Sequence, residues 1–161
     1  MTTIFTFVKP AKYAKPFTPS LEAKLFVALL RLSDRLAQDA DLLIKSFGLT
    51  GTQYNVLRIL RGAGPDGLPC KGIGDRMISR DPDMTRLLDR MEKRQLITRE
   101  RQSEDRRVIK TRITPGGLEI LKKLDGPVDE LHRKQFRHLP ASKLKALAEA
   151  IEEAFPSGAA D

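Results

Sequence analysis

The basic side chains of this chain are concentrated between residues 71 and 112. That segment holds 13 Lys and Arg and eight Asp and Glu, so its net charge is +5, whereas the whole chain of 161 residues carries +8. Guanidinium and ammonium groups form charge-assisted hydrogen bonds with phosphate oxygens, so the segment is suited to a polyanion such as nucleic acid. The other interpretation of the same pattern is a solvated face with internal salt bridges.

Few side chains outside this segment have the types and spacing for other chemistry. The single cysteine, Cys70, has Lys71 beside it, which can make a thiol more reactive, but a lone cysteine is more often a small buried packing residue. His132 and His138 are six residues apart, with no Cys or carboxylate set at metal-ligand spacing, which favours ordinary helix-surface histidines. We therefore expect no enzymatic activity, no metal site and no cofactor.

The composition indicates the compartment and the size of the core. About 40% of the residues are hydrophobic, which is enough for one domain with or without an appendage. One cysteine cannot form an intramolecular disulfide, which fits a reducing compartment. The sequence has no run of about 18 apolar residues and no signal-peptide pattern at its start. We therefore expect a cytoplasmic protein.

Residues 1–20 form an unusual N-terminal arm. Three prolines interrupt any helix there, yet four of the nine aromatic residues of the chain lie in it. Disordered tails are usually poor in aromatic residues. We expect an extended segment that packs on a neighbour, such as a second subunit at a dimer interface, and a mobile tail is the alternative.

Apolar periodicity predicts the helices that come before the basic segment. Leucines at i, i+4 and i+7 spacing predict a long helix over 20–46. Thr50 and Gln53 then form a capping-box pattern at the start of a second helix, and "GAGPDG" at 62–67 ends it.

The next elements position the basic residues themselves. A short helix is predicted over 71–79. Asp81, as N-cap, and Pro82, at the first helical position, predict the start of a further helix. The tail over 115–155 is helical again, in two pieces, with a kink expected at Pro127.

Between these helices the period changes from helical to strand-like. Residues 97–102 and 108–114 flank a short polar turn, and apolar or β-branched residues alternate with basic ones in the second arm. The sequence therefore predicts a mainly α protein with a small β-hairpin wing. A three-helix unit followed by a β-hairpin is a winged helix-turn-helix, in which the last helix before the hairpin enters the DNA major groove.

Three stretches of the sequence form one pattern: "LTGTQYNVLRIL", "DMTRLLDRMEKRQLITRERQSEDRRVIKTRIT" and the closing "TPGG". This pattern resembles the MarR family of bacterial transcriptional regulators, and the resemblance covers residues from about 20 to 155. It implies a homodimer whose helical dimerisation region comprises 21–47 and 115–155. It also implies a winged DNA-binding region over 48–114. The arm at 1–20 is expected, from its composition, to pack at the dimer interface. Members of the family bind pseudo-palindromic operators.

The resemblance assigns DNA contacts to the start of the recognition helix and to the wing. Asp105 is expected to orient Arg107, so that an arginine of the wing enters the minor groove. Asp83 is expected either to accept a hydrogen bond from a cytosine amino group or to support the helix N-terminus. The expected DNA-binding residues are Pro82, Asp83, Met84, Thr85, Arg86, Arg90, Asp105, Arg106, Arg107 and Lys110.

The resemblance also implies a ligand site, and one of the departures from the family pattern lies at the end of the recognition helix. Many members release DNA when a small anionic aromatic compound binds, and the candidate ligand residues here are Arg31, Arg35 and Tyr54. The family usually has glycine directly after the recognition helix, where this chain has Gln95. A glutamine in the left-handed conformation that ends a helix costs about 1 kcal/mol.

The expected function is a dimeric, sequence-specific DNA-binding regulator, a repressor released by a small molecule. The expected partners are double-stranded DNA, a second copy of the chain and an anionic aromatic ligand, with no membrane. The alternative is a winged-helix module that binds protein or RNA rather than a DNA operator.

Overall fold

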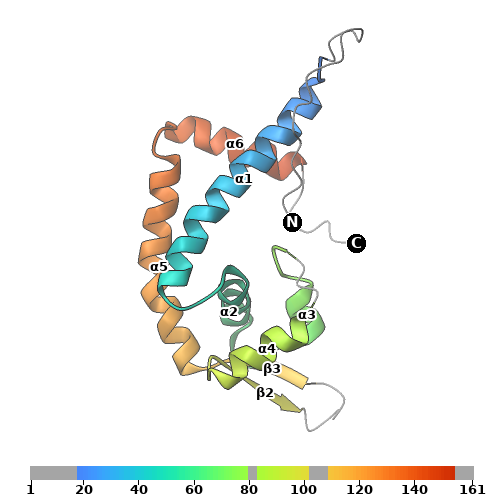
Figure 1. Cartoon of the computed structure of the whole chain (residues 1–161), viewed down its shortest axis with the longest axis vertical. Coiled ribbons are helices and arrows are strands. Elements are labelled where there is room, and N and C mark those ends of the chain that lie inside the picture. The colour runs from blue at the N-terminus through green and yellow to red at the C-terminus, as the bar shows by residue number, and fades with distance from the viewer. Residues whose placement is uncertain (1–17, 80–82, 102–108, 155–161) are drawn as a thin grey trace, which may run out of the picture. The chain divides into compact units, whose positions relative to one another are not determined.

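The computed structural model describes residues 18–79, 83–101 and 109–154. The chain divides into two compact units, Met1–Arg35 and Leu36–Asp161. The elements follow the predicted order of helices around a hairpin (Figure 1), and none of the helices within the described ranges is long and apolar enough to cross a membrane. They are α1 (Leu21–Ser46), α2 (Gly51–Ala63), the 3-10 turn η1 (Gly64–Asp66), β1 (Leu68–Pro69), α3 (Cys70–Gly74), α4 (Met84–Lys93), β2 (Ile97–Arg101), β3 (Ile109–Ile113), α5 (Pro115–Phe136) and α6 (Ala141–Ala154).

The first unit consists of the N-terminal part of α1 and leaves apolar side chains exposed. Leu21 is 77% exposed, Phe26 63% and Leu25 57%. Leu21 and Leu25 are four residues apart, so they lie on one face of the helix and form an exposed apolar stripe. The prediction that the N-terminal arm packs on a neighbour concerns residues 1–17, which lie outside the described ranges.

The start of α2 confirms the predicted capping box. The Gln53 backbone N–H donates to Thr50 Oγ1 at 3.2 Å, and the Thr50 N–H donates to Gln53 Oε1 at 3.1 Å. These bonds satisfy amide groups that have no partner inside the helix. The fully buried side chains of Val56, Leu57 and Leu60 then fix α2 in the core of the second unit.

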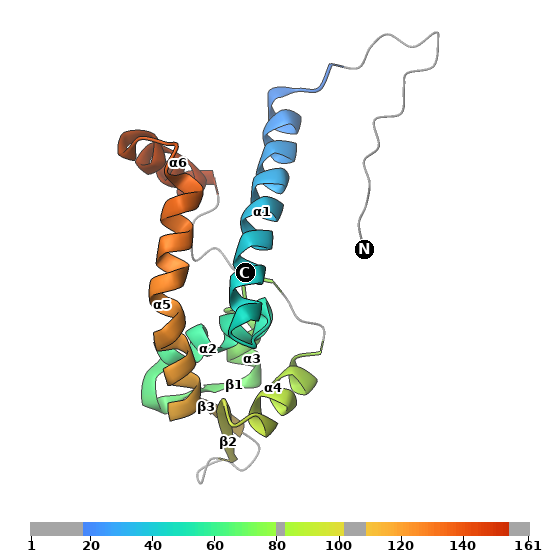
Figure 2. The ribbon, with the colours of Figure 1, turned by 60° about the vertical axis from the view of Figure 1, so that its left-hand side comes forward.

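The wing is a three-stranded antiparallel sheet in the order β1-β3-β2. The predicted hairpin is confirmed for the described residues, with Ile97 opposite Ile113 and Arg101 opposite Ile109. The strand β1, which pairs Leu68 with Thr111, was not predicted, because two residues are too few to show a period. Figure 2 shows α4, β2 and β3 at the same end of the second unit.

Two helices differ from their predicted bounds. The short helix α3 ends at Gly74 instead of continuing to Ser79, since two glycines in five residues give it little intrinsic stability. The N-cap of α4 is Asp83 and not Asp81, because the Asp83 carboxylate accepts a hydrogen bond from the Arg86 N–H at 3.3 Å.

Two other expectations concern single residues. Gln95 has φ +57°, which confirms the left-handed conformation expected directly after the recognition helix. Cys70 is exposed, so the expectation of a buried packing residue was wrong. It lies at the first position of α3, directly after Pro69.

The helix α5 connects the wing to the second half of α1. The Thr114 hydroxyl accepts from the Gly117 N–H at 3.1 Å and caps α5. The helix continues through Pro127 without a break. Near its end, Gln135 Nε2 donates to the Leu36 carbonyl at 3.2 Å, so α5 runs beside the second half of α1 (Figure 1).

Replacing Asp125 with asparagine should lower the stability of the protein in a pH-dependent manner. Arg61 donates to the Asp125 carboxylate at 2.8 Å between α2 and α5, and this bond lowers the pKa of Asp125. The ionised carboxylate therefore stabilises the fold above its unfolded pKa, and the contribution is lost as the pH falls through the lowered pKa. Because both side chains are at least one third exposed, we expect a loss of only about 0.5 kcal/mol at pH 7.

Urea titrations of both proteins from about pH 7 to about pH 2 test this expectation. The difference in unfolding free energy should shrink towards zero at the acid end. A difference that stayed constant over that range would show that the ion pair does not cause the effect.

Candidate DNA-binding site

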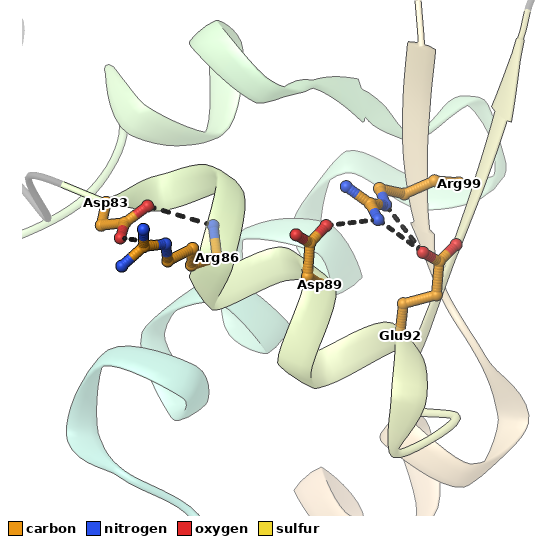
Figure 3. Close-up of polar contacts among 5 residues, drawn as sticks. All are labelled: Asp83, Arg86, Asp89, Glu92 and Arg99. Carbon is orange, nitrogen blue, oxygen red and sulfur yellow. Dashed lines mark hydrogen bonds and ion pairs between the residues drawn. The ribbon is translucent and has the colours of Figure 1, made fainter.

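The first turn of α4 presents polar side chains around a capped helix start. The two carboxylate oxygens of Asp83 are used separately: one accepts from the Arg86 N–H, and the other lies 3.2 Å from Arg86 Nε (Figure 3). Asp83 therefore supports the helix N-terminus, as one of the two expectations proposed. The Arg86 side chain remains 79% exposed despite this ion pair, so a phosphate or a base edge can still reach it.

The apolar face of α4 fixes which side chains face solvent. Leu87, Leu88 and Met91 are buried in the core, and Met84 is half-buried against it. Of the predicted DNA-binding residues, Thr85, Arg86 and Arg90 are exposed on the other face. Lys110 is half-buried on β3, opposite Glu100 of β2. Thr85, Arg86 and Arg90 therefore lie on the recognition helix, and Lys110 lies on the wing. Four further predicted residues lie outside the described residues: Pro82, Asp105, Arg106 and Arg107.

A cluster of charged side chains between α4 and β2 was not predicted. Arg99 of β2 donates to Asp89 at 2.6 Å through Nη2, and to Glu92 at 2.6 Å through Nη2 and at 2.9 Å through Nε (Figure 3). These bonds raise the pKa of Arg99, first through the hydrogen bond to Glu92. The cluster ties the recognition helix to the wing and neutralises carboxylates on the helix edge that faces the wing.

A second ion pair within the wing neutralises another of its arginines. Arg112 of β3 donates to Glu100 at 2.7 Å and to the Pro65 carbonyl at 2.7 Å. Arg90, Lys93 and Arg101 form no ion pair with another described residue. The interpretation of internal salt bridges is therefore right for Arg86, Arg99 and Arg112, and other cations of α4 and β2 remain available for phosphate.

The end of α4 is attached to the turn between α1 and α2. Arg94 donates to the Gly48 carbonyl at 2.8 Å and to Gln53 Oε1 at 3.2 Å. Gln53 is only 6% exposed, and its amide oxygen also takes part in the capping box. The recognition helix is therefore held by arginine contacts to two elements, β2 and the α1–α2 turn.

A cleft with a volume of about 670 Å³ lies beside α2 in the second unit. Its walls come from the second half of α1, from α2, from α5 and from residues 77–79, which precede the recognition helix. Tyr54, one of the predicted ligand residues, lines it, and Arg58, whose guanidinium lies 5.9 Å from the Tyr54 ring centre, is beside it. Asn55 and His132 also line it.

Sequence reasoning did not find Asn55, Arg58 or His132 as cleft residues. Their spacing on α2 and α5 contains no motif, and only the packing of the two helices brings them together. The other predicted ligand residues, Arg31 and Arg35, lie on exposed parts of α1 in the first unit and are not among the cleft residues.

A capped helix with exposed cations, packed against a three-stranded wing, defines a winged-helix DNA-binding protein. Residues 49–109 match the model of the MarR family. The chain is 38% identical to a MarR transcription factor from Planctomyces limnophilus, over 84% of this chain and 98% of that chain, with a TM-score of 0.65. The chain therefore belongs to the MarR family.

Two curated relatives are regulators of the same kind. The HTH-type transcriptional regulator MhqR of Bacillus subtilis is 31% identical over 61% of this chain and 66% of its own length, which is just under two thirds. The HTH-type transcriptional repressor IacR of Pseudomonas putida is 27% identical over 81% of this chain and 77% of its own length. The family consists of DNA-binding transcriptional regulators and is not known for enzymatic activity, so the expectation of a DNA-binding regulator is confirmed.

Replacing Arg86 with alanine should weaken DNA binding by about 1–3 kcal/mol, since the side chain is exposed at the start of the recognition helix. Fluorescence anisotropy with a panel of single-base operator variants distinguishes its role. A uniform loss over all sequences indicates a phosphate contact, and relaxed preference at one position indicates a base contact. Arg86→Lys should keep most of a phosphate contact, and unchanged affinity in Arg86→Ala would exclude both roles.

Proposed function

We propose that this regulator acts as a homodimer on a pseudo-palindromic operator, represses transcription there, and leaves the DNA when a small anionic aromatic ligand occupies the cleft. The observation that carries this proposal is the position of the cleft. Residues 77–79 form part of its wall and are separated by only four residues from the start of the recognition helix α4 at Met84. This function requires the compartment that holds chromosomal DNA, which is the cytoplasm of a bacterium.

The apolar surface of the helices supports the dimer. Leu21, Leu25 and Phe26 of α1 are more than half exposed, and Ile151 of α6 is 47% exposed. A monomer in water gains no stability from such surfaces, whereas a second copy would bury them. The same chemistry makes residues 1–20, with their four aromatics, candidates for the interface.

The side chains of the cleft support an anionic aromatic ligand. Arg58 and Tyr54 lie on consecutive turns of α2, so one offers a cation and the other an aromatic face. His132 and Asn55 add polar groups, and Ile44, Ile59 and Val128 supply apolar walls. Clefts that bind small molecules combine mostly apolar walls with a few polar groups in this way. Repression agrees with the similarity to the repressor IacR.

Footprinting of the DNA upstream of the gene tests the operator. We expect two protected half-sites about one helical turn apart, and affinity that falls steeply with salt. Replacing both Arg106 and Arg107 with alanine should weaken binding without loss of the dimer if the wing enters the minor groove. Absence of protection at moderate salt would contradict the proposal.

A thermal-shift screen with aromatic carboxylates and their thioesters tests the ligand. A compound that binds the folded protein must raise its melting temperature, and it should also release the operator fragment. Arg58→Gln should abolish the shift if the guanidinium holds the anion. Compounds that raise the melting temperature but leave the DNA complex intact would argue against ligand release.

A further inference from the structure

The side chain of Asn55 forms a bond between α2 and the segment before the recognition helix. Its Oδ1 accepts a hydrogen bond from the backbone N–H of Ile78 at 3.0 Å, across 23 residues of sequence. The neighbouring backbone bonds are local, with Arg76 N–H donating to Ile73 O and Met77 N–H to Gly74 O. The Ile78 side chain is 91% exposed, so its own burial does not hold it in place, whereas the neighbouring Met77 is partly buried against the core. The carboxamide bond is therefore the side-chain hydrogen bond that fixes the Ile78 backbone to α2, beside the apolar contact of Met77.

The backbone of Asn55 is fixed by the buried residues that follow it in α2. The next residues of α2, Val56 and Leu57, are fully buried in the core. The position of its carboxamide is therefore set by α2, and the position of the Ile78 amide follows from it. Ser79 is four residues before Asp83, the N-cap of α4, so the chain between them spans at most about 14 Å. The bond consequently limits where the recognition helix can start.

The same bond forms part of the wall of the cleft. Asn55, Met77, Ile78 and Ser79 all line it. A molecule in the cleft therefore lies against both Asn55 and Ile78. Polar groups of that molecule would compete for the carboxamide of Asn55, or its volume would displace residues 77–79.

The two ends of α4 differ in their relation to the cleft. The far end is attached to Gly48 and Gln53 through Arg94, and none of these three residues lines the cleft. An occupant of the cleft therefore reaches the segment before the start of α4, where Asp83, Thr85 and Arg86 lie, while the far end keeps its attachment.

We infer that Asn55 is a positioning residue for the recognition helix, and that an occupant of the cleft acts on DNA binding through the bond between Asn55 and Ile78. The first part concerns the DNA-binding function of the family, and the second rests on the proposed ligand response. Asn55 contacts no DNA in this scheme. It acts by holding the segment that leads into α4.

The variants Asn55→Leu and Asn55→Asp test the positioning role. Leucine has a similar size but no acceptor, and it should weaken affinity for the footprinted DNA fragment about three- to tenfold. The slope of log affinity against log salt should not change, because no phosphate contact is lost. Aspartate keeps the acceptor and should restore affinity to within about twofold of the native chain.

Hydrogen exchange of the Ile78 amide provides a readout that needs neither DNA nor ligand. Exchange at residues 77–79 should accelerate in Asn55→Leu and return to the native rate in Asn55→Asp, with the rest of α2 unchanged. General loosening of α2, or native affinity in Asn55→Leu, would overturn the positioning role. Neither result bears on whether a natural ligand exists, so this failure is distinguishable from that of the proposed function.

An aromatic group attached inside the cleft tests the second part without knowledge of the natural ligand. In a Cys70→Ser background, Ala37→Cys places one thiol on the cleft wall, and benzyl methanethiosulfonate attaches a phenyl ring to it as a mixed disulfide. The modified protein should lose affinity for the DNA fragment by at least about fivefold, and a reductant should restore it. The Cys70→Ser protein treated with the same reagent is the control.

The decisive comparison is the same modification in an Asn55→Leu background. If the bond transmits the effect, the modification should change affinity by less than about twofold there. An equal loss in both backgrounds, or no loss in the first, would overturn the inference.

Discussion

Replacing Arg99 with glutamine should lower the stability of the folded protein by about 2–3 kcal/mol and weaken DNA binding by at least about tenfold. The native guanidinium makes three short bonds to Asp89 and Glu92, and its side chain is only 24% exposed. Charge-assisted bonds of this kind are the stronger ones, and their loss leaves two carboxylates without a partner. We expect these unpaired carboxylates to repel the phosphates of bound DNA.

A double-mutant cycle separates the two effects of Arg99. Asp89→Asn combined with Glu92→Gln removes the unpaired charges, so the triple variant should regain part of the DNA affinity lost by Arg99→Gln alone. Arg99→Lys keeps the charge but not the bidentate geometry, and it should lie between the native chain and the glutamine variant. Equilibrium unfolding and operator titration measure both quantities, and additive losses in the cycle would exclude coupling through this cluster.

Replacing Gly67 with alanine should destabilise the protein by about 3–5 kcal/mol. Gly67 has φ +64° and ψ −171°, a backbone conformation that side chains rarely allow. A Cβ there would collide with the carbonyl oxygen of Thr111, which is backbone and cannot turn away, and would lie 2.7 Å from Arg112 Cγ. The strain falls at the start of β1, so the edge of the wing sheet should separate from β3.

Gly62→Ala is the matched control for this prediction. Gly62 lies near the end of α2, and a Cβ there meets no atom within 4 Å. The substitution should leave stability unchanged or raise it by up to about 1 kcal/mol, because alanine favours the helix. Thermal unfolding of both variants gives the comparison, and equal melting temperatures would show that the conformation at Gly67 is not essential.

The local parts of the fold could be predicted from the sequence because their signals are local. The leucine period of α1, the capping box of Thr50 and Gln53, and the alternation in β3 each lie within a few residues, and the structure confirms them. The start of α4 was harder, because Asp81 and Asp83 are both acceptable N-caps. Packing of Met84, Leu87 and Leu88 on the core agrees with a start after Asp83.

The contacts between distant parts of the chain could not be predicted, because no local sequence pattern accompanies them. Arg99 looks like any other basic residue of the hairpin, and its partners on α4 are seven and ten residues away. The cleft joins Asn55 to His132 across the sequence, and only the packing of α2 against α5 brings them to one wall. The resemblance to a family gave the general place of a ligand site but not these side chains.

The left-handed conformation of Gln95 affects how many amino-acid substitutions this protein can tolerate. Its strain, about 1 kcal/mol, is borne at the junction of the recognition helix and the wing, and glycine there would relieve much of it. Stability gained after the end of α4 can offset the cost of new side chains on the exposed face of that helix. A Gln95→Gly background would therefore tolerate more substitutions at Thr85, Arg86 and Arg90, and would suit selection for altered operator preference.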